Sequence, residues 1–177
     1  MSRARNIILT GFMGTGKSAV GRKLAARLDR KFIDTDVLIE QAAGMSIARL
    51  FSEKGEPYFR ELEQQVIARV SLQDGAVIAT GGGALVKEVN AERLKASGIL
   101  ICLTATPEVI LARVQRDTAR PLLLAEDPLA KIHALLTVRA EAYAKAHVMI
   151  DTSHLSVDEV VEAVQAAVAG EVYTLMK

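Results

Sequence analysis

The sequence has little cysteine, almost no excess charge and no long hydrophobic run. Cys102 is the only cysteine, so no disulfide can form within the chain, and a reducing compartment fits this use. Lys and Arg number 22 against 21 Asp and Glu, whereas proteins that bind nucleic acids or membrane surfaces usually carry a clear basic excess. No apolar run approaches the roughly 20 residues of a membrane span, and the N-terminus lacks the apolar stretch of a signal peptide. We therefore expect a cytoplasmic protein without nucleic-acid or membrane partners.

The chain does contain a regular alternation of short apolar runs and helical patterns. Its 177 residues are about the size of one ordinary domain. Such alternation is typical of a parallel α/β sheet. The predicted strands cover residues 6–10, 32–33, 76–79, 99–103 and 148–150. The predicted helices cover residues 17–28, 37–43, 46–53, 57–71, a segment from 106, residues 127–146, and a last helix opened by a capping box at 156–159.

A phosphate-binding loop is the clearest motif. Residues 11–18 read GFMGTGKS and fit the pattern G-x-x-x-x-G-K-[ST], between a predicted strand and a predicted helix. Glycines let the backbone wrap around phosphate, while successive N–H groups and the helix N-terminus face the anion. We expect Lys17 to reach the β- and γ-phosphates and Ser18 to bind Mg²⁺. No guanine-reading N-K-x-D or L-S-G-G-Q motif is present, which leaves a small-molecule kinase as the best interpretation.

Two aspartates follow the second predicted strand. Asp34 and Asp36 are two residues apart, so in an extended segment they would point to the same side. The carboxyl ends of parallel strands face the ligand crevice. One carboxylate could therefore hold hydrated Mg²⁺ while the other accepts a proton from an attacking hydroxyl. The alternative is a pair of carboxylates that only cap a helix.

An arginine and a glycine turn are candidates for the acceptor side. Arg60 and Glu63 share a helix face, so the glutamate could aim the guanidinium at a substrate carboxylate. An exposed ion pair is the alternative. Gly81, Gly82 and Gly83 follow a buried strand, where they allow a sharp turn with bare N–H groups near a ligand.

Three further arginines lie in the second half of the chain. Residues 117–127 show no hydrophobic period, and we expect a mobile loop there, with Arg116 and Arg120 at its start. An arginine on a closing loop could stabilise the charge that develops on the γ-phosphate. Arg139 could be a second carboxylate clamp, whereas Tyr143, four residues on, is expected to pack.

Taken together, these motifs resemble the shikimate kinase family, in order and over nearly the whole chain. The P-loop is shared by many enzymes, but the remaining constellation is much more specific. The residues that carry the resemblance are GFMGTGKS from Gly11, Asp34-Thr35-Asp36, Phe59-Arg60 with Glu63, Gly81-Gly82-Gly83, Arg120-Pro121-Leu122-Leu123, and Arg139 with Tyr143.

The resemblance implies a fold and a domain layout. The family fold is a three-layer P-loop kinase fold, with a five-stranded parallel sheet, helices on both faces and a mobile lid. It implies one domain over residues 1–177, a lid at about 117–127 and an acceptor-binding helical region at about 35–71. The implied reaction transfers the γ-phosphate of ATP to the 3-hydroxyl of shikimate.

The resemblance also implies residue roles. Ser18 and Asp34 would serve Mg²⁺, and Asp36 would bind the shikimate hydroxyls and act as base. Glu63 would orient Arg60, Arg120 would be the lid arginine, and the implied catalytic set is Lys17, Asp36 and Arg120. The implied ATP-binding residues are Gly14, Thr15, Gly16, Lys17, Ser18, Ala19, Arg116, which would lie along the adenine, and Arg120. The implied substrate-binding residues are Asp36, Arg60, Gly81, Gly82, Gly83 and Arg139.

Rival interpretations differ in the acceptor or in the class of protein. A kinase for gluconate or a nucleoside monophosphate is the nearest rival, but two arginines and two aspartates suit a carboxylated polyol better than a nucleobase. A nucleotide-dependent switch without turnover is the rival from another class, and the intact set of Lys17, Ser18, Asp34, Asp36 and Arg120 argues against it. From its size and the absence of an obvious oligomerisation helix, we expect a monomer.

Overall fold

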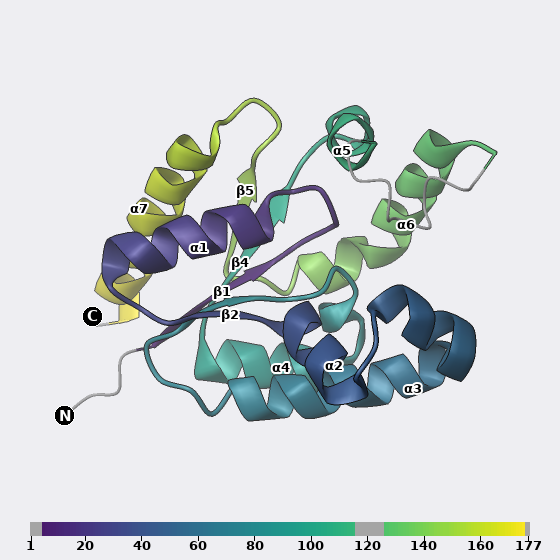
Figure 1. Ribbon diagram of the computed structural model, residues 1–177. Helices are drawn as coiled ribbons and strands as arrows, with labels where there is room; N and C mark the ends of the chain where they lie inside the picture. The colour runs from purple at the N-terminus through teal and green to yellow at the C-terminus, as the bar shows by residue number, and fades with distance from the viewer. Residues whose placement is uncertain (1–4, 116–125, 176–177) are drawn as a thin grey trace.

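Five parallel strands form the centre of the computed structural model, which describes residues 5–115 and 126–175, with the side chains of 171–175 excepted (Figure 1). The strand order is β2-β3-β1-β4-β5, and every neighbouring pair is parallel. The predicted α/β class and five-stranded parallel sheet are confirmed. The strands are β1 (Asn6–Thr10), β2 (Phe32–Asp34), β3 (Val77–Ala79), β4 (Gly98–Thr104) and β5 (Val148–Asp151).

Helices cover both faces of the sheet (Figure 1). One face packs against α1 (Lys17–Leu28) and α7 (Val157–Leu175), and the other against α2 (Thr35–Ala43), α3 (Ile47–Val70) and α4 (Glu88–Ser97). The remaining helices are the short η1 (Ala84–Val86), α5 (Pro107–Val114) and α6 (Pro128–Tyr143).

The two faces of the sheet divide the core because side chains alternate along each strand. In β1, Ile7 and Leu9 join the cluster under α1 and α7, whereas Ile8 joins the cluster on the opposite face. Both clusters are fully buried, so the central strands are apolar on both sides, as parallel sheets require. Cys102 lies on β4, within the predicted strand 99–103, and is buried.

Several predicted boundaries need correction. The second helix begins at Thr35 rather than near residue 37, because the Asp34 carboxylate caps it by accepting a hydrogen bond from the Asp36 N–H. The predicted break at Gly55 is present, with φ 80°, inside the continuous run of α3. The helix predicted to end near residue 146 ends at Tyr143. No prediction covered α4 or η1.

The topology places the phosphate loop at a switch point of the sheet. From β1 the chain passes to β2 and β3 on one side, and β4 and β5 lie on the other. In open α/β sheets, ligands bind beyond the carboxyl ends of the strands at such a point. The phosphate loop follows β1, the two aspartates lie at the β2–α2 junction and the glycine turn follows β3, so the fold brings these predicted site residues to one edge of the sheet.

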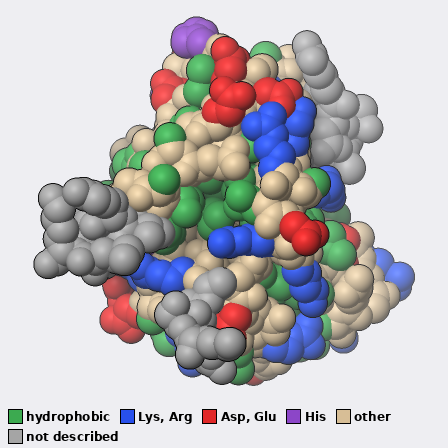
Figure 2. Space-filling view, turned by 90° about the vertical axis from the view of Figure 1, so that its left-hand side faces the viewer, with side chains coloured by type: hydrophobic (Ala, Val, Ile, Leu, Met, Phe, Trp, Pro, Cys, Tyr) green, Lys and Arg blue, Asp and Glu red, His purple; other side chains and the backbone are tan. Residues whose placement is uncertain are grey.

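The surface matches the balanced composition. On the face drawn in Figure 2, Lys and Arg side chains are spread among acidic and polar ones, and hydrophobic side chains line a hollow near the middle. Among the described residues, no helix is long and apolar enough to cross a membrane.

Candidate active site

A cavity of about 470 Å³ opens beyond the carboxyl ends of the strands. Its walls come from the phosphate loop, the β2–α2 junction, α3, the glycine turn and α6. Most predicted site residues therefore meet in one place. They are Gly14, Gly16, Lys17, Ser18, Ala19, Asp34, Asp36, Arg60, Glu63, Gly82, Gly83 and Arg139.

The phosphate loop has the backbone that an anion site needs. Gly11, Gly14 and Gly16 have φ values of 128°, 76° and 94°, in the region that residues with a Cβ rarely adopt. No side chain caps α1, so its first N–H groups are left to meet an anion. Lys17 Nζ donates to the Phe12 carbonyl at 2.7 Å, which holds the ammonium within the loop.

Asp34 links the second strand to the phosphate loop. Its Oδ2 accepts a hydrogen bond from Ser18 Oγ at 2.7 Å, and its Oδ1 accepts one from the Asp36 N–H at 3.1 Å. Asp34 therefore both caps α2 and faces the nucleotide side, so the capping alternative and the functional one are compatible. The argument that both aspartates lie in one extended segment was wrong, because Asp36 is in the first turn of α2.

Oxygen atoms from Ser18 and Asp34 suit Mg²⁺. Magnesium usually keeps several waters and takes one or two protein oxygens together with substrate phosphates. The two side chains lie next to each other on the cavity wall, beside the loop for phosphate. Among the described residues, no cluster of three or more His, Cys, Asp or Glu could form a protein cage for a metal. This donor set fits an ion that is shared with a nucleotide.

Asp36 is poised to titrate near neutrality. Burial, which is the largest cause, and the negative charge of Asp34 raise the pKa of its carboxyl from 3.8 to about 6, against the opposing charge of Lys17. A carboxylate whose pKa lies near the working pH is a suitable general base.

Arg60 is held rigidly on α3. Its Nη1 donates to Glu63 Oε2 at 2.8 Å, and its Nε and Nη2 donate to Glu56 Oε1, both at 3.2 Å. Its guanidinium also lies 5.1 Å from the centre of the Phe59 ring. The Glu63 side chain is only 1% exposed, so this pair is not the exposed ion pair weighed as the alternative. Glu63 Oε1 has no hydrogen-bond partner among the described residues.

Each glycine of the turn after β3 faces one acceptor residue. A Cβ on Gly81 would lie 2.7 Å from Asp36 Oδ1, and one on Gly83 would lie 2.7 Å from Arg60 Nη1. A Cβ on Gly82 would lie 3.4 Å from Arg139 Nη1. The absence of side chains thus lets the carboxylate and both guanidinium groups converge on the turn.

The Gly82 carbonyl accepts two hydrogen bonds. Arg139 Nη1 donates to it at 3.3 Å and Tyr143 Oη at 2.7 Å. Tyr143 packs in the core as expected, with 5% of its surface exposed, and its hydroxyl has this hydrogen bond in addition. Burial raises the pKa of Tyr143 to about 12, so the hydroxyl keeps its proton. The Arg139 guanidinium also lies 5.3 Å from the centre of the Phe12 ring, which joins α6 to the phosphate loop.

Arg113 lines the cavity although no sequence motif predicted it as a site residue. From α5 it donates to the Gly14 carbonyl at 3.2 Å, and to Thr152 Oγ1 and the Thr152 carbonyl at 3.0 and 2.6 Å. It thereby ties the phosphate loop to the loop after β5. One arginine on a helix surface, with partners about 40 and 99 residues away, gives no local signal in the sequence.

Some predicted site residues cannot be placed. Arg116, Arg120 and residues 117–125 of the predicted lid lie outside the described residues. At the end of that segment, Asp127 caps α6 by accepting a hydrogen bond from the Ala130 N–H at 2.9 Å. The last residue of the predicted lid is therefore the start of a helix.

Comparisons with known proteins agree with this geometry. A sequence model of the family "Shikimate kinase" matches residues 13–169. The shikimate kinase of Caldanaerobacter subterraneus subsp. tengcongensis is 47% identical over 160 residues, 90% of this chain and 94% of that protein. The shikimate kinase of Geobacter sulfurreducens is 48% identical over 160 residues, 90% of this chain and 88% of that protein.

A solved structure is similar over almost its full length. The shikimate kinase from Acinetobacter baumannii in complex with shikimate superimposes with a TM-score of 0.90 at 37% identity. The match covers 95% of this chain and 94% of that chain.

Proposed function

The chain belongs to the shikimate kinase family, and we propose that the cavity described above carries out the family's reaction through its own P-loop, aspartates and arginines. The protein is an ATP-dependent kinase that transfers the γ-phosphate of ATP to the 3-hydroxyl of shikimate, giving 3-phosphoshikimate and ADP. The observation that carries the residue assignment is the convergence of Asp36, Arg60 and Arg139 on one glycine turn, opposite the phosphate loop.

The nucleotide phosphates bind along residues 14–19. The positive-φ glycines and the uncapped start of α1 supply backbone N–H groups, and Lys17 exchanges the Phe12 carbonyl for the β- and γ-phosphates. Ser18 and Asp34 hold Mg²⁺, which when bound neutralises charge that develops on the phosphates.

The base of the nucleotide lies in the adjoining hollow of about 310 Å³. Its lining includes Thr15, Arg113, Thr152 and Leu155, and it continues from the phosphate loop to the start of α7. Arg113 lines both this hollow and the main cavity, as does Gly16 of the phosphate loop. It is therefore the described arginine best placed to lie along a base.

Shikimate binds on the other side of the phosphate loop. Its carboxylate binds to the guanidinium groups of Arg60 and Arg139, because guanidinium groups can form two parallel hydrogen bonds to a carboxylate. Glu63 keeps Arg60 in place and offers the unpartnered Oε1 to a ring hydroxyl. The three glycines leave room for the ring.

Asp36 completes the reaction. The 3-hydroxyl oxygen forms a bond to the γ-phosphorus as the bond from that phosphorus to the β–γ bridging oxygen breaks, and ADP leaves with the electron pair. The hydroxyl proton passes to Asp36, whose near-neutral pKa suits this transfer. Catalysis rests on positioning and charge neutralisation rather than on covalent chemistry. Arg120 is proposed as the lid residue that adds positive charge at the γ-phosphate.

The remaining proposals concern the whole protein. We propose one kinase domain, a monomer, acting in the cytoplasm. Elution at the mass of a single chain, 19.1 kDa, in gel filtration with light scattering would support the monomer, whereas a larger mass at micromolar concentration would contradict it.

ADP release tests the assignment. We expect purified protein with Mg²⁺-ATP to release ADP rapidly only when shikimate is present, while gluconate and nucleoside monophosphates leave the rate at background. Stimulation by one of those acceptors would retain a P-loop kinase and overturn the acceptor assignment. Tight ATP binding with no turnover on any acceptor would favour a nucleotide-dependent switch.

A further inference from the structure

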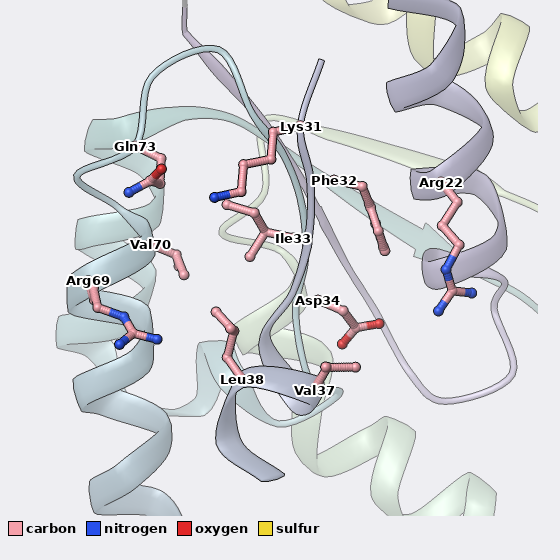
Figure 3. Close-up of a pocket in the computed structure, with 10 residues that line it drawn as sticks. All are labelled: Arg22, Lys31, Phe32, Ile33, Asp34, Val37, Leu38, Arg69, Val70 and Gln73. Atoms are coloured by element: carbon pink, nitrogen blue, oxygen red, sulfur yellow. The ribbon is translucent and has the colours of Figure 1, made fainter. Parts of the chain in front are cut away.

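A second hollow of about 460 Å³ lies outside the active site, along the exposed edge of β2 (Figure 3). β2 is the outermost strand on its side of the sheet. The hollow, hereafter the β2-edge groove, lies between α1 and the C-terminal part of α3. Its size falls within the usual range of small-molecule sites.

The apolar part of the groove comes from both strands and helices. Ile33 is directed towards α3, where it faces Leu38 and Val70, and Phe32 lies on the α1 side (Figure 3). Ile33 and Val70 are buried and belong to the core, so they form the floor of the groove. The groove thus offers an apolar surface that does not depend on a loop.

Three cations stand around this surface. Lys31 extends along the α3 side of β2, the Arg69 guanidinium turns from α3 towards the strand, and Arg22 approaches from α1 (Figure 3). In the described part of the chain, none of the three forms an ion pair. Arg22 stacks on Phe32, with 5.4 Å from its guanidinium carbon to the ring centre. Asp34 is the sole acid among the lining residues that the structure describes.

The edge strand adds backbone groups. Val77 N–H donates to the Lys31 carbonyl at 2.9 Å, so Lys31 turns its backbone towards β3. Alternate residues of a paired strand direct their groups to the same neighbour, so the N–H and carbonyl of Phe32 face the groove. A three-residue strand exposes too few such groups to hold a peptide strand firmly, which favours a small ligand over a polypeptide.

We propose that the β2-edge groove binds a small organic anion, whose apolar body lies against the half-buried Leu38 above the buried Ile33 and Val70, and whose acidic group meets Lys31 and Arg69. Charge complementarity supports this occupant, because the groove brings together three cations that have no ion pair among the described residues and only one acid of its described lining. The site goes beyond the kinase reaction, since none of these cations lines the active-site cavity.

A ligand in the β2-edge groove should change the affinity for Mg²⁺-nucleotide through Asp34. Asp34 lines both cavities, and it holds Ser18 and the start of α2. Leu38, on the groove wall, belongs to the same helix. A ligand that favours one position of the β2–α2 junction must change the affinity for Mg²⁺-nucleotide, and nucleotide must change its affinity in return.

Binding is tested with phenyl phosphate and benzoate as probes, which separate a phosphate from a carboxylate headgroup. The protein is first saturated with ADP, Mg²⁺ and shikimate, so that the probe cannot enter the active site. We expect calorimetry to give one site with a Kd on the order of 1 mM or tighter for at least one probe. Inorganic phosphate and benzyl alcohol, which each lack one half of the ligand, should bind at least about tenfold more weakly.

Charge variants locate the site. Lys31→Glu combined with Arg69→Glu should weaken probe binding at least about tenfold, and the milder pair Lys31→Gln with Arg69→Gln serves if the first variant fails to fold. Lys95→Glu, an exposed change on α4, should bind like the wild type. Without probe, all three should keep the wild-type kcat.

Two results would overturn the proposal. If neither probe binds, or if the charge variants bind as well as the wild type, the three cations serve only to keep an edge strand from pairing with another chain. The coupling through Asp34 is wrong if probe binds but leaves the Kd for Mg²⁺-ADP unchanged.

Discussion

Burial gives Asp36 two properties that can be measured separately. The same desolvation that raises its pKa to about 6 suits it to the proposed role of a base near neutrality and makes its ionised form costly in the folded protein. A catalytic residue that destabilises its own fold is an expected feature of active sites. Both consequences follow from the position of one carboxylate between Asp34, Glu63 and Lys17.

The pH profile reports the base. We expect kcat/KM for shikimate to rise with pH through about 6, because Asp36 must be ionised to accept a proton. Asp36→Asn should lower kcat by at least about 10²-fold and remove this limb of the profile. Steady-state kinetics between pH 5 and 8 measures both. A wild-type kcat in the variant would exclude Asp36 as the base.

Asp36→Asn should lose activity but gain stability near neutral pH. A carboxyl with a raised folded pKa contributes stability that is present below its unfolded value of 3.8 and is lost as pH rises through about 6. At pH 7.5 the variant should therefore be more stable than the wild type, by roughly 1–3 kcal/mol. Urea denaturation at pH 7.5 and pH 4 checks this. The gain should be absent at pH 4, and a destabilised variant at pH 7.5 would contradict the burial argument.

Tyr143 is predicted to allow Arg139 to turn away from the Gly82 carbonyl. When Arg139 turns to a substrate carboxylate, Tyr143 keeps the Gly82 carbonyl satisfied, so the move leaves no buried acceptor unpaired. Tyr143→Phe should raise the KM for shikimate about 5- to 20-fold, with the KM for ATP nearly unchanged. Kinetics with each substrate varied in turn measures the split. Equal changes in both values would indicate a structural role alone.

At the scale of elements, the glycine turn after β3 is the part whose shape the acceptor residues require. Its three residues lie against Asp36, Arg139 and Arg60 in turn, so a methyl group at any of them meets a functional atom. The turn was predicted from three consecutive glycines directly after a buried strand. Its pairing with particular side chains was not, because the partners come from α2, α3 and α6.

Gly83→Ala tests this element. The new Cβ would lie 2.7 and 2.8 Å from the two terminal nitrogens of Arg60, which Glu56 and Glu63 hold in place. We expect the KM for shikimate to rise at least about tenfold while ATP binding is kept. Gly170→Ala is the control, because at this exposed position on α7 the added Cβ would meet none of the described atoms within 4 Å beyond its chain neighbours and its own helix backbone, and it should behave as wild type. Unchanged kinetics in Gly83→Ala would show that Arg60 moves freely.

Elements with a local sequence signal were predicted well, whereas contacts between residues far apart in the chain were not. Strands and helices with strong periods, such as β1 and α1, were predicted within a residue, because their signals are local. Helix α4 was missed because its pattern is weakly amphipathic. The dual role of Asp34 and the bridge made by Arg113 depend on partners far along the chain, which no local pattern reports.

For the whole molecule, the sheet acts as the frame that joins two binding sites. In the proposed assignment, residues near β1 and β5 build the nucleotide side, and residues after β2 and β3 and on α6 build the acceptor side. Phe12 and Asp34 belong to the junction between them, through the contact with Arg139 and the hydrogen bond from Ser18. The central claim is that the acceptor side recognises a carboxylate through Arg60.

The most direct measurement compares shikimate with its carboxamide on the wild type and on Arg60→Ala. We predict that the wild type loses at least about 10²-fold in kcat/KM when the carboxylate becomes an amide, because a forked charged contact is lost. In Arg60→Ala, which has lost that contact and keeps only the one from Arg139, the same change of substrate should cost at least about tenfold less than it does in the wild type. If Arg60→Ala discriminates between the two substrates as strongly as the wild type does, Arg60 does not bind the carboxylate and the acceptor site has been assigned wrongly.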